Sequence, residues 1–97
     1  MIDVSRDHIN QGNKGNNASC PIALALNSAN EEWVCYVWSY MTHIYNKNEL
    51  PKIQYWHSDQ LREWIERYDR STDGSKPEPI TLVFRENTMD IQPETDF

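Results

Sequence analysis

The sequence predicts a small α+β domain, with two short N-terminal helices and one amphipathic helix on one face of a mostly antiparallel sheet of four to five short strands. Residues 33–56 are rich in Val, Ile, Tyr and Trp, residues 58–70 carry an apolar stripe at helical spacing, and residues 80–85 alternate apolar with polar side chains. At 97 residues the chain can bury about two-thirds of its unfolded surface. We therefore expect a single domain over residues 1–85 and a tail over residues 86–97.

The N-terminal segment predicts one short strand and two short helices. Residues 2–4 alternate as in a strand, and Ser5 can cap a helix that ends near residue 11. A loop rich in glycine and asparagine follows. The second helix should run from Pro21 to about Asn27 or Ala29, with Ser19 as its N-cap and the proline in its first turn, where a missing N–H costs nothing.

The middle of the chain predicts three strands, near residues 33–39, 41–46 and 52–56. A turn over residues 46–48 separates the second strand from the third, whereas the break near Ser39 is only weakly marked. Both faces of the first of these strands are apolar. The sheet is therefore either covered on both sides or exposes aromatic side chains on one of them.

The helix over residues 58–70 is predicted by its apolar positions, which recur at i, i+3, i+4 and i+7. These positions are Leu61, Trp64, Ile65 and Tyr68. Ser58 is a suitable N-cap. The strand over residues 80–85 follows a linker rich in Ser, Gly and Pro, and the acidic segment beyond Glu86 is expected to be extended or disordered.

Charge and composition exclude several function classes. The net charge of −6 disfavours a nucleic-acid binder or a protein that binds an anionic membrane surface, since both need clustered Lys and Arg. A basic protein surface, such as one that normally holds DNA or RNA, is instead a natural partner. The sequence shows no apolar run near 18 residues and no signal peptide, and two cysteines are too few for a disulfide framework. We expect a cytoplasmic protein.

A resemblance adds to this interpretation. The chain resembles a set of small uncharacterised proteins encoded by tailed bacteriophages, over roughly residues 2–85. The matching positions are Ser5-Arg6-Asp7-His8-Ile9, Gly12, Gly15, Cys20-Pro21-Ile22-Ala23-Leu24-Ala25, Tyr68-Asp69 and Ile80–Phe84. The resemblance implies an accessory protein that acts in the cytoplasm of a host bacterium, in host takeover or against a defence of the CRISPR type. It brings no catalytic residue with it.

The residues with catalytic or metal-binding chemistry predict structural roles. Cys20 at a helix N-terminus could be a nucleophile beside His8, His43 or His57, but a small buried residue that seals the helix start explains it better. No pair among these residues and Cys35 has the spacing of a metal site. The glycines form no phosphate loop. We predict no enzyme, no metal and no cofactor.

Binding residues are predicted in the middle of the chain, where most of the aromatic side chains lie. Tyr and Trp dominate binding hot spots, and a sheet face that turns to solvent would expose Tyr36, Trp38 and Tyr40. We expect these side chains to contact and inhibit a host protein. Acidic side chains could occupy the nucleic-acid channel of such a partner, and the candidates are Glu31, Glu32, Glu63 and Glu66.

Two alternatives stay open. The chain could be a small-molecule or nucleotide sponge in which aromatic rings stack on a base, with Lys14, Lys47 and Lys52 as the nearest basic groups. A homodimer could also form through an edge strand and bury part of the aromatic block.

Overall fold

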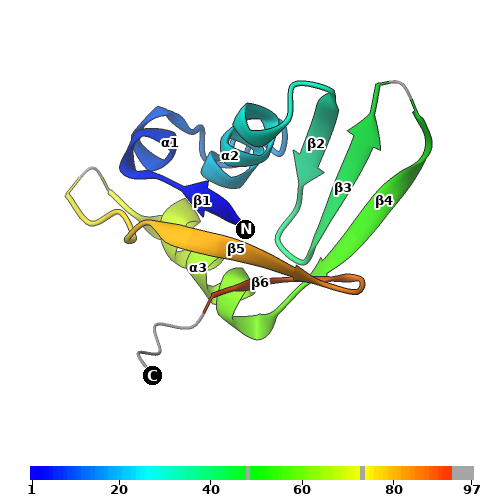
Figure 1. Cartoon of the computed structure of the whole chain (residues 1–97). Coiled ribbons are helices and arrows are strands. Elements are labelled where there is room, and N and C mark those ends of the chain that lie inside the picture. The colour runs from blue at the N-terminus through cyan, green and yellow to red at the C-terminus, as the bar shows by residue number, and fades with distance from the viewer. Residues whose placement is uncertain (48, 73, 93–97) are drawn as a thin grey trace.

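A computed structural model describes residues 1–47, 49–72 and 74–92, and these form a small α+β domain, which confirms the predicted fold class. Within the described residues, six strands and three helices follow one another along the chain (Figure 1). They are β1 (Ile2–Val4), α1 (Arg6–Gln11), α2 (Pro21–Ala29), β2 (Trp33–Val37), β3 (Met41–Asn46), β4 (Glu49–His57), α3 (Asp59–Arg70), β5 (Ile80–Arg85) and β6 (Thr88–Ile91).

The strands form one sheet in the order β1-β5-β6-β4-β3-β2, which curls into a half-barrel. Every neighbouring pair is antiparallel except β4 and β6, which run parallel. Helix α2 contacts both edge strands, β1 and β2, so it lies between the two ends of the curled sheet (Figure 1). Helix α3 packs against β4 and β6 on the concave side.

Local sequence explains where the helices begin. Ser5 forms a capping box with His8, since the Ser5 hydroxyl accepts from the His8 N–H at 3.2 Å and the Ser5 N–H donates to His8 Nδ1 at 3.0 Å. Ser58 caps α3 by accepting from the Leu61 N–H at 3.2 Å. The predicted cap of α2 was wrong by one residue. Cys20, and not Ser19, is its N-cap, and Pro21 occupies the first helical position.

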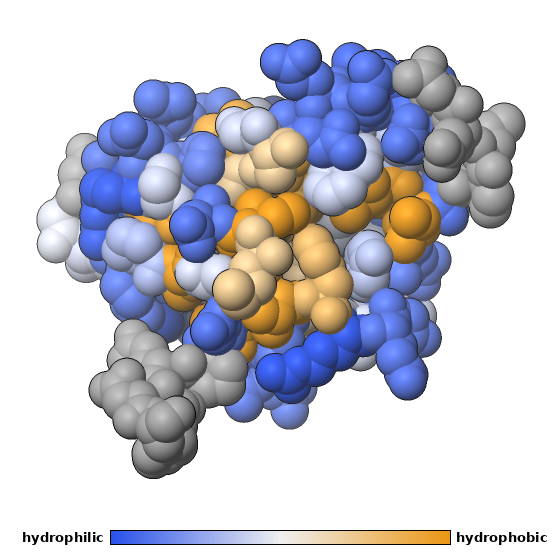
Figure 2. Space-filling view, viewed as in Figure 1, coloured by the Kyte–Doolittle hydropathy of each residue, from blue (hydrophilic) through white to orange (hydrophobic). Residues whose placement is uncertain are grey.

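The core consists of side chains from the helices and from the strands of the curled sheet. Its largest fully buried side chain is Trp64, whose ring stacks on Tyr68 with centroids 6.1 Å apart and whose Nε1–H donates to the Glu78 carbonyl at 2.9 Å. Tyr55 of β4 meets Phe84 of β5 across the concave side, with ring centroids 4.8 Å apart. Apolar residues also gather over β1 and β5 on the face shown in Figure 2.

Two boundaries differ from the expectation. Strand β4 begins at Glu49, earlier than the expected residue 52. The segment after Glu86, expected to be a tail, instead forms β6, which lies between β5 and β4 in the sheet. Its signal in the sequence is weak because Met89 and Ile91 are the only apolar residues in a strand of four. The rest of the expected tail, residues 93–97, lies outside the described residues.

In the described part of the chain, no helix has both the length and the apolar character needed to cross a membrane.

Candidate protein-binding face

One face of β2, β3 and β4 is lined by aromatic side chains because of the strand register. Cys35 of β2 pairs with Ile44 of β3, and both side chains are buried on the core side. Successive side chains of a strand alternate between faces, so Tyr36 and its partner His43 point the opposite way. We call this outward-facing set the aromatic face. It consists of Tyr36, Trp38, Tyr40, His43, Tyr45 and Trp56.

The rings of the aromatic face pack against one another. Tyr36 lies 6.3 Å from Trp38 and 5.9 Å from Tyr45, between ring centroids, and meets Tyr45 edge to face. Trp38 packs its ring on His43 at 4.8 Å. Tyr40 stacks on Trp56 at 6.2 Å with an interplanar angle of 23°. Such ring–ring contacts restrict the orientations of these side chains.

Much of this aromatic surface is exposed. Trp38 is 38% exposed, Tyr40 50%, Tyr45 36% and Trp56 46%, whereas Tyr36 is half-buried. A contiguous group of large exposed rings is unusual on a monomeric protein. Tyr36, Trp38 and Tyr40, the aromatic residues predicted as a binding patch, therefore lie together on this face.

Sequence reasoning missed half of the aromatic face, namely His43, Tyr45 and Trp56. The pairing of β3 with β2 and β4 brings these residues beside the predicted ones. Their signal in the sequence was alternation, because odd-numbered residues of β3 share a face and Trp56 pairs with Met41 on that face. Trp33 and Tyr55, from the same stretch of sequence, instead pack against the core.

One cation lies on the aromatic face. Lys52 Nζ lies 5.9 Å from the centroid of the Tyr45 ring and 3.4 Å from His43 Nδ1. Partial burial of the His43 ring lowers its pKa, and the nearby Lys52 ammonium lowers it further. His43 is therefore neutral at physiological pH, and the local charge of the face comes from Lys52.

His57 holds the β2–β3 turn that presents Tyr40. Its main-chain N–H donates to the Tyr40 carbonyl at 2.9 Å, and its ring Nδ1 lies 3.1 Å from the Ser39 carbonyl. The other ring nitrogen, Nε2, lies 2.6 Å from the Thr42 hydroxyl. The bonds to Tyr40 and Ser39 tie the end of β4 to the turn, and the bond to Thr42 ties it to β3, so Tyr40 and Trp56 are fixed relative to one another.

The predicted acidic residues do not join the aromatic face as one surface. Glu31 and Glu32 are exposed in the connection between α2 and β2, whereas Glu63 and Glu66 are exposed on α3. Figure 1 places that connection and α3 at opposite sides of the molecule. Glu63 and Glu66 are separated from the aromatic face because α3 packs on the concave side of the sheet, whereas Glu31 and Glu32 directly precede β2.

Cys20 is poorly placed for nucleophilic catalysis. The residue is half-buried, and burial raises the pKa of its thiol although the N–H groups of Ala23 and Ile22 act in the opposite direction. His8 is engaged by Ser5, and His57 by Thr42 and Ser39. Over residues 1–47, 49–72 and 74–92, no three His, Cys, Asp or Glu side chains are grouped so that they could hold a metal ion.

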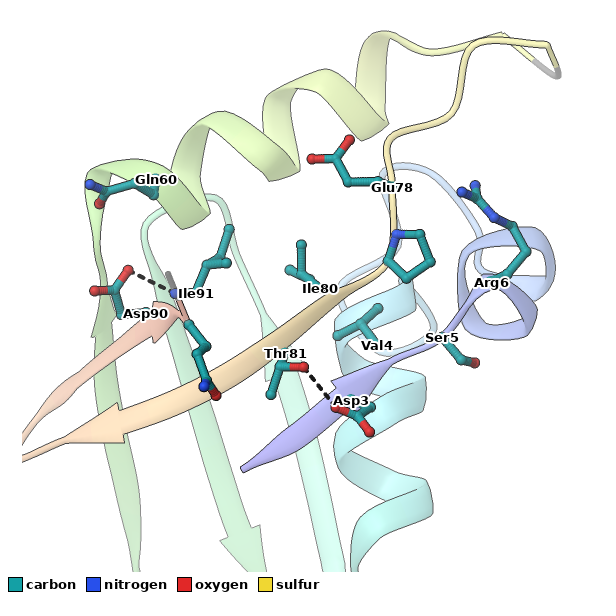
Figure 3. Close-up of a pocket in the computed structure, with 12 residues that line it drawn as sticks. Asp3, Val4, Ser5, Arg6, Gln60, Glu78, Ile80, Thr81, Asp90 and Ile91 are labelled. Atoms are coloured by element: carbon teal, nitrogen blue, oxygen red, sulfur yellow. Dashed lines mark hydrogen bonds between the residues drawn. The ribbon is translucent and has the colours of Figure 1, made fainter. Parts of the chain in front are cut away.

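A cavity of about 930 Å³ lies between α3 and the β1–α1 segment and crosses β5 (Figure 3). Ile80, Ile91 and Val4 line its apolar part. Its charged groups are already bonded within the protein, since Asp3 accepts from Thr81 at 2.7 Å and Arg6 donates to the Pro77 carbonyl at 3.1 Å. Glu78 is paired with Arg67 and Asp90 with Arg85. This cavity therefore offers no obvious reactive group.

The comparisons with known proteins leave the function to the geometry of the site: no family model, no curated protein and no solved structure matches this chain.

Proposed function

We propose that the protein acts by stoichiometric binding, docking its aromatic face on another protein and inhibiting it. The observation that carries this proposal is the group of exposed, mutually packed rings on the outer face of β2, β3 and β4. Trp and Tyr are enriched among the few residues that dominate binding energy at interfaces. Their edge-to-face packing also lowers the entropy that must be lost when the complex forms.

Docking by the face is favoured over pairing with the sheet edge. Helix α2 contacts the edge strand β2, and the Val37 N–H on that edge already donates to the Asn17 carbonyl at 2.8 Å. A covered edge does not readily accept a further strand. The same observation disfavours a homodimer formed by pairing of two β2 strands, which leaves the aromatic face as the contact surface.

The identity of the partner is proposed from the sequence. The resemblance to tailed-bacteriophage proteins makes the partner a host protein, in host takeover or in a defence of the CRISPR type. The net charge of −6 favours a partner with a basic surface. Because the four predicted glutamates lie in two separate parts of the molecule, we assign them to long-range attraction and not to one direct contact.

The nucleotide alternative receives less support. Lys14, Lys47 and Lys52 are the basic groups proposed to meet a phosphate, and none of them lines either cavity in the described part of the chain. The edge-to-face packing of Tyr36 with Tyr45 also leaves fewer free ring faces for a base to stack on.

Site-specific photocrosslinking tests the proposal. A photoreactive p-benzoylphenylalanine replaces Tyr40, on the aromatic face, or Ile53, which is 53% exposed and pairs with the core residue Ile44 on the other face of β4. Illumination in host cells should give one discrete adduct with a host protein from position 40 and none from position 53. Native mass spectrometry of the purified complex should then show a fixed stoichiometry.

The variant Trp56→Ser removes a ring from the aromatic face, and Ile53→Ser is its matched control on the other face. Trp56→Ser should abolish the adduct at position 40, whereas Ile53→Ser should leave it unchanged. An adduct that forms only from position 53, or no adduct from either position, would contradict docking by the aromatic face.

A further inference from the structure

The second cavity, of about 540 Å³, opens beside the aromatic face and shares Trp38 with it. It is lined by the loop over residues 15–17, the start of α2, the end of β2 with the two residues that follow it, and α3. Trp38 is an exposed aromatic residue of this lining, and the buried Trp64 and Tyr68 also belong to it. Trp38 therefore lies where the aromatic face and this cavity meet.

The chemistry of the cavity is aromatic and negative. Asp69 is its one charged side chain, since the lining contains no Lys, Arg or His. The Asp69 carboxylate lies close enough to the Cys20 sulfur to add to the rise that burial causes in the pKa of that thiol. The remaining polar groups belong to Asn16, Asn17 and Ser39, which can accept hydrogen bonds through their side-chain oxygens.

The ends of the two helices beside the cavity also affect whether it favours a positively or a negatively charged ligand. The cavity lies at the C-terminal turn of α3, whose carbonyl groups attract positive charge. The protein's own Lys14 ammonium, which donates to the Ser71 carbonyl just beyond α3, already meets part of this attraction, so the Asp69 carboxylate carries the preference for a cation. The N-terminus of α2 would act in the opposite sense, but the N–H groups of Ile22 and Ala23 are directed at the Cys20 sulfur.

We propose that this cavity receives the guanidinium of an arginine side chain of the partner protein, a step that rests on the proposed function and names one of its contacts. Guanidinium is planar, so it stacks on the Trp38 ring, and its two parallel N–H donors match the Asp69 carboxylate. Arginine is also among the residues enriched at interface hot spots. A lysine ammonium offers neither the stacking plane nor the fork of donors.

Titration with N-acetylarginine amide tests the cavity alone, without any partner. Amide and indole NMR signals are followed, and the changes should concentrate on Trp38, Trp64, Tyr68 and Asp69. The isosteric N-acetylcitrulline amide lacks the charge and should cause no comparable change. The lysine analogue should bind more weakly than the arginine analogue.

Two variants on α3 form a matched pair. Asp69→Asn should weaken binding of the arginine analogue by about tenfold, since a hydrogen-bonded charge pair is lost. Glu66→Gln removes the same charge from the same helix at an exposed position outside the cavity lining, and it should leave binding unchanged. Equal effects of the two variants, equal binding of the citrulline analogue, or signal changes away from the cavity would overturn the proposal.

The crosslinking experiment separates this inference from the proposed function. If the adduct from position 40 forms normally in Asp69→Asn and the affinity of this variant for the host protein is unchanged, docking by the aromatic face stands and the arginine contact is wrong. If no adduct forms from position 40 while the arginine analogue still needs Asp69, the docking proposal fails, and arginine binding by the cavity remains as a property without that partner.

Discussion

Thr42 and His57 form a buried hydrogen bond of 2.6 Å between the threonine hydroxyl and the imidazole Nε2. The Ser39 carbonyl can only accept, so the ring nitrogen 3.1 Å from it, Nδ1, carries the hydrogen. In the neutral ring Nε2 then accepts from Thr42. This arrangement satisfies the whole imidazole without a charge, and burial lowers the pKa of His57 to about 4.

Stability should consequently depend on pH through His57. The pKa of this histidine is about 4 in the folded protein and near its ordinary 6.5 in the unfolded chain. Between these values the unfolded chain binds more protons, so the free energy of unfolding falls as the pH is lowered from 6.5 to 4, by about 3 kcal/mol. Urea denaturation across this window should show the loss in the wild type.

His57→Gln is the control for the pH dependence. It removes the titrating group, so its free energy of unfolding should change less with pH over the same window, even though the variant starts from a lower stability. A pH profile of His57→Gln parallel to that of the wild type would assign the dependence to other groups.

The two tryptophans Trp56 and Trp64 should respond differently to truncation. Trp56 is 46% exposed on the aromatic face, so Trp56→Ala should lower the free energy of unfolding by about 1 kcal/mol. Trp64 is 1% exposed and fills the core, so Trp64→Ala should cost about 3–5 kcal/mol. Chemical denaturation measures both. A large loss for Trp56→Ala would mean that the aromatic face mainly supports the fold.

Gly12 is required by a close approach to Pro21. A Cβ at position 12 would lie 2.6 Å from Pro21 Cδ, a proline ring that cannot rotate away. Gly12→Ala should therefore lower the free energy of unfolding by about 1–3 kcal/mol. Gly74→Ala is the matched control, because nothing lies within 4 Å of its Cβ position, and it should be neutral or slightly stabilising. Thermal denaturation of both variants checks this, and equal effects would contradict it.

Cys20 should react slowly with iodoacetamide near neutral pH. Burial raises the pKa of its thiol, so little thiolate is present. Cys35 should react more slowly still, because it is buried and burial raises its pKa to about 11. Mass spectrometry of the alkylated native protein measures both rates, with urea-unfolded protein as the reference. Rapid native labelling of Cys20 would reopen a catalytic role for this residue.

The parts of the fold that the sequence predicts correctly are those with a local signal. Helix α3 is predicted because its apolar side chains recur at helical spacing along residues 59–70. Strand β6 is missed because its alternation covers only four residues, and its parallel pairing with β4 depends on a part of the chain far away in the sequence. No local pattern encodes such a pairing.

The same difference between local signals and contacts between distant segments applies to the candidate site. Residue type singled out the stretch that holds Tyr36, Trp38 and Tyr40, but Trp33 and Tyr55 from the same stretch pack against the core. His43 and Trp56 join them only through strand register, and the cavity at Asp69 needs α3 to pack beside the end of β2. The glutamates were grouped by charge, but their positions in space depend on which face of the sheet each helix covers.

Strand β6 has a further consequence for the order in which the sheet assembles during synthesis. Among the described strands it is the sole link between the β1–β5 pair and the β4–β3–β2 group, and it is the last of them to leave the ribosome. Until residues 88–91 emerge, these two groups of strands share no neighbour in the sheet. Pairing within β4–β3–β2 needs no later segment of the chain, so we expect the aromatic face to form before the whole sheet is joined.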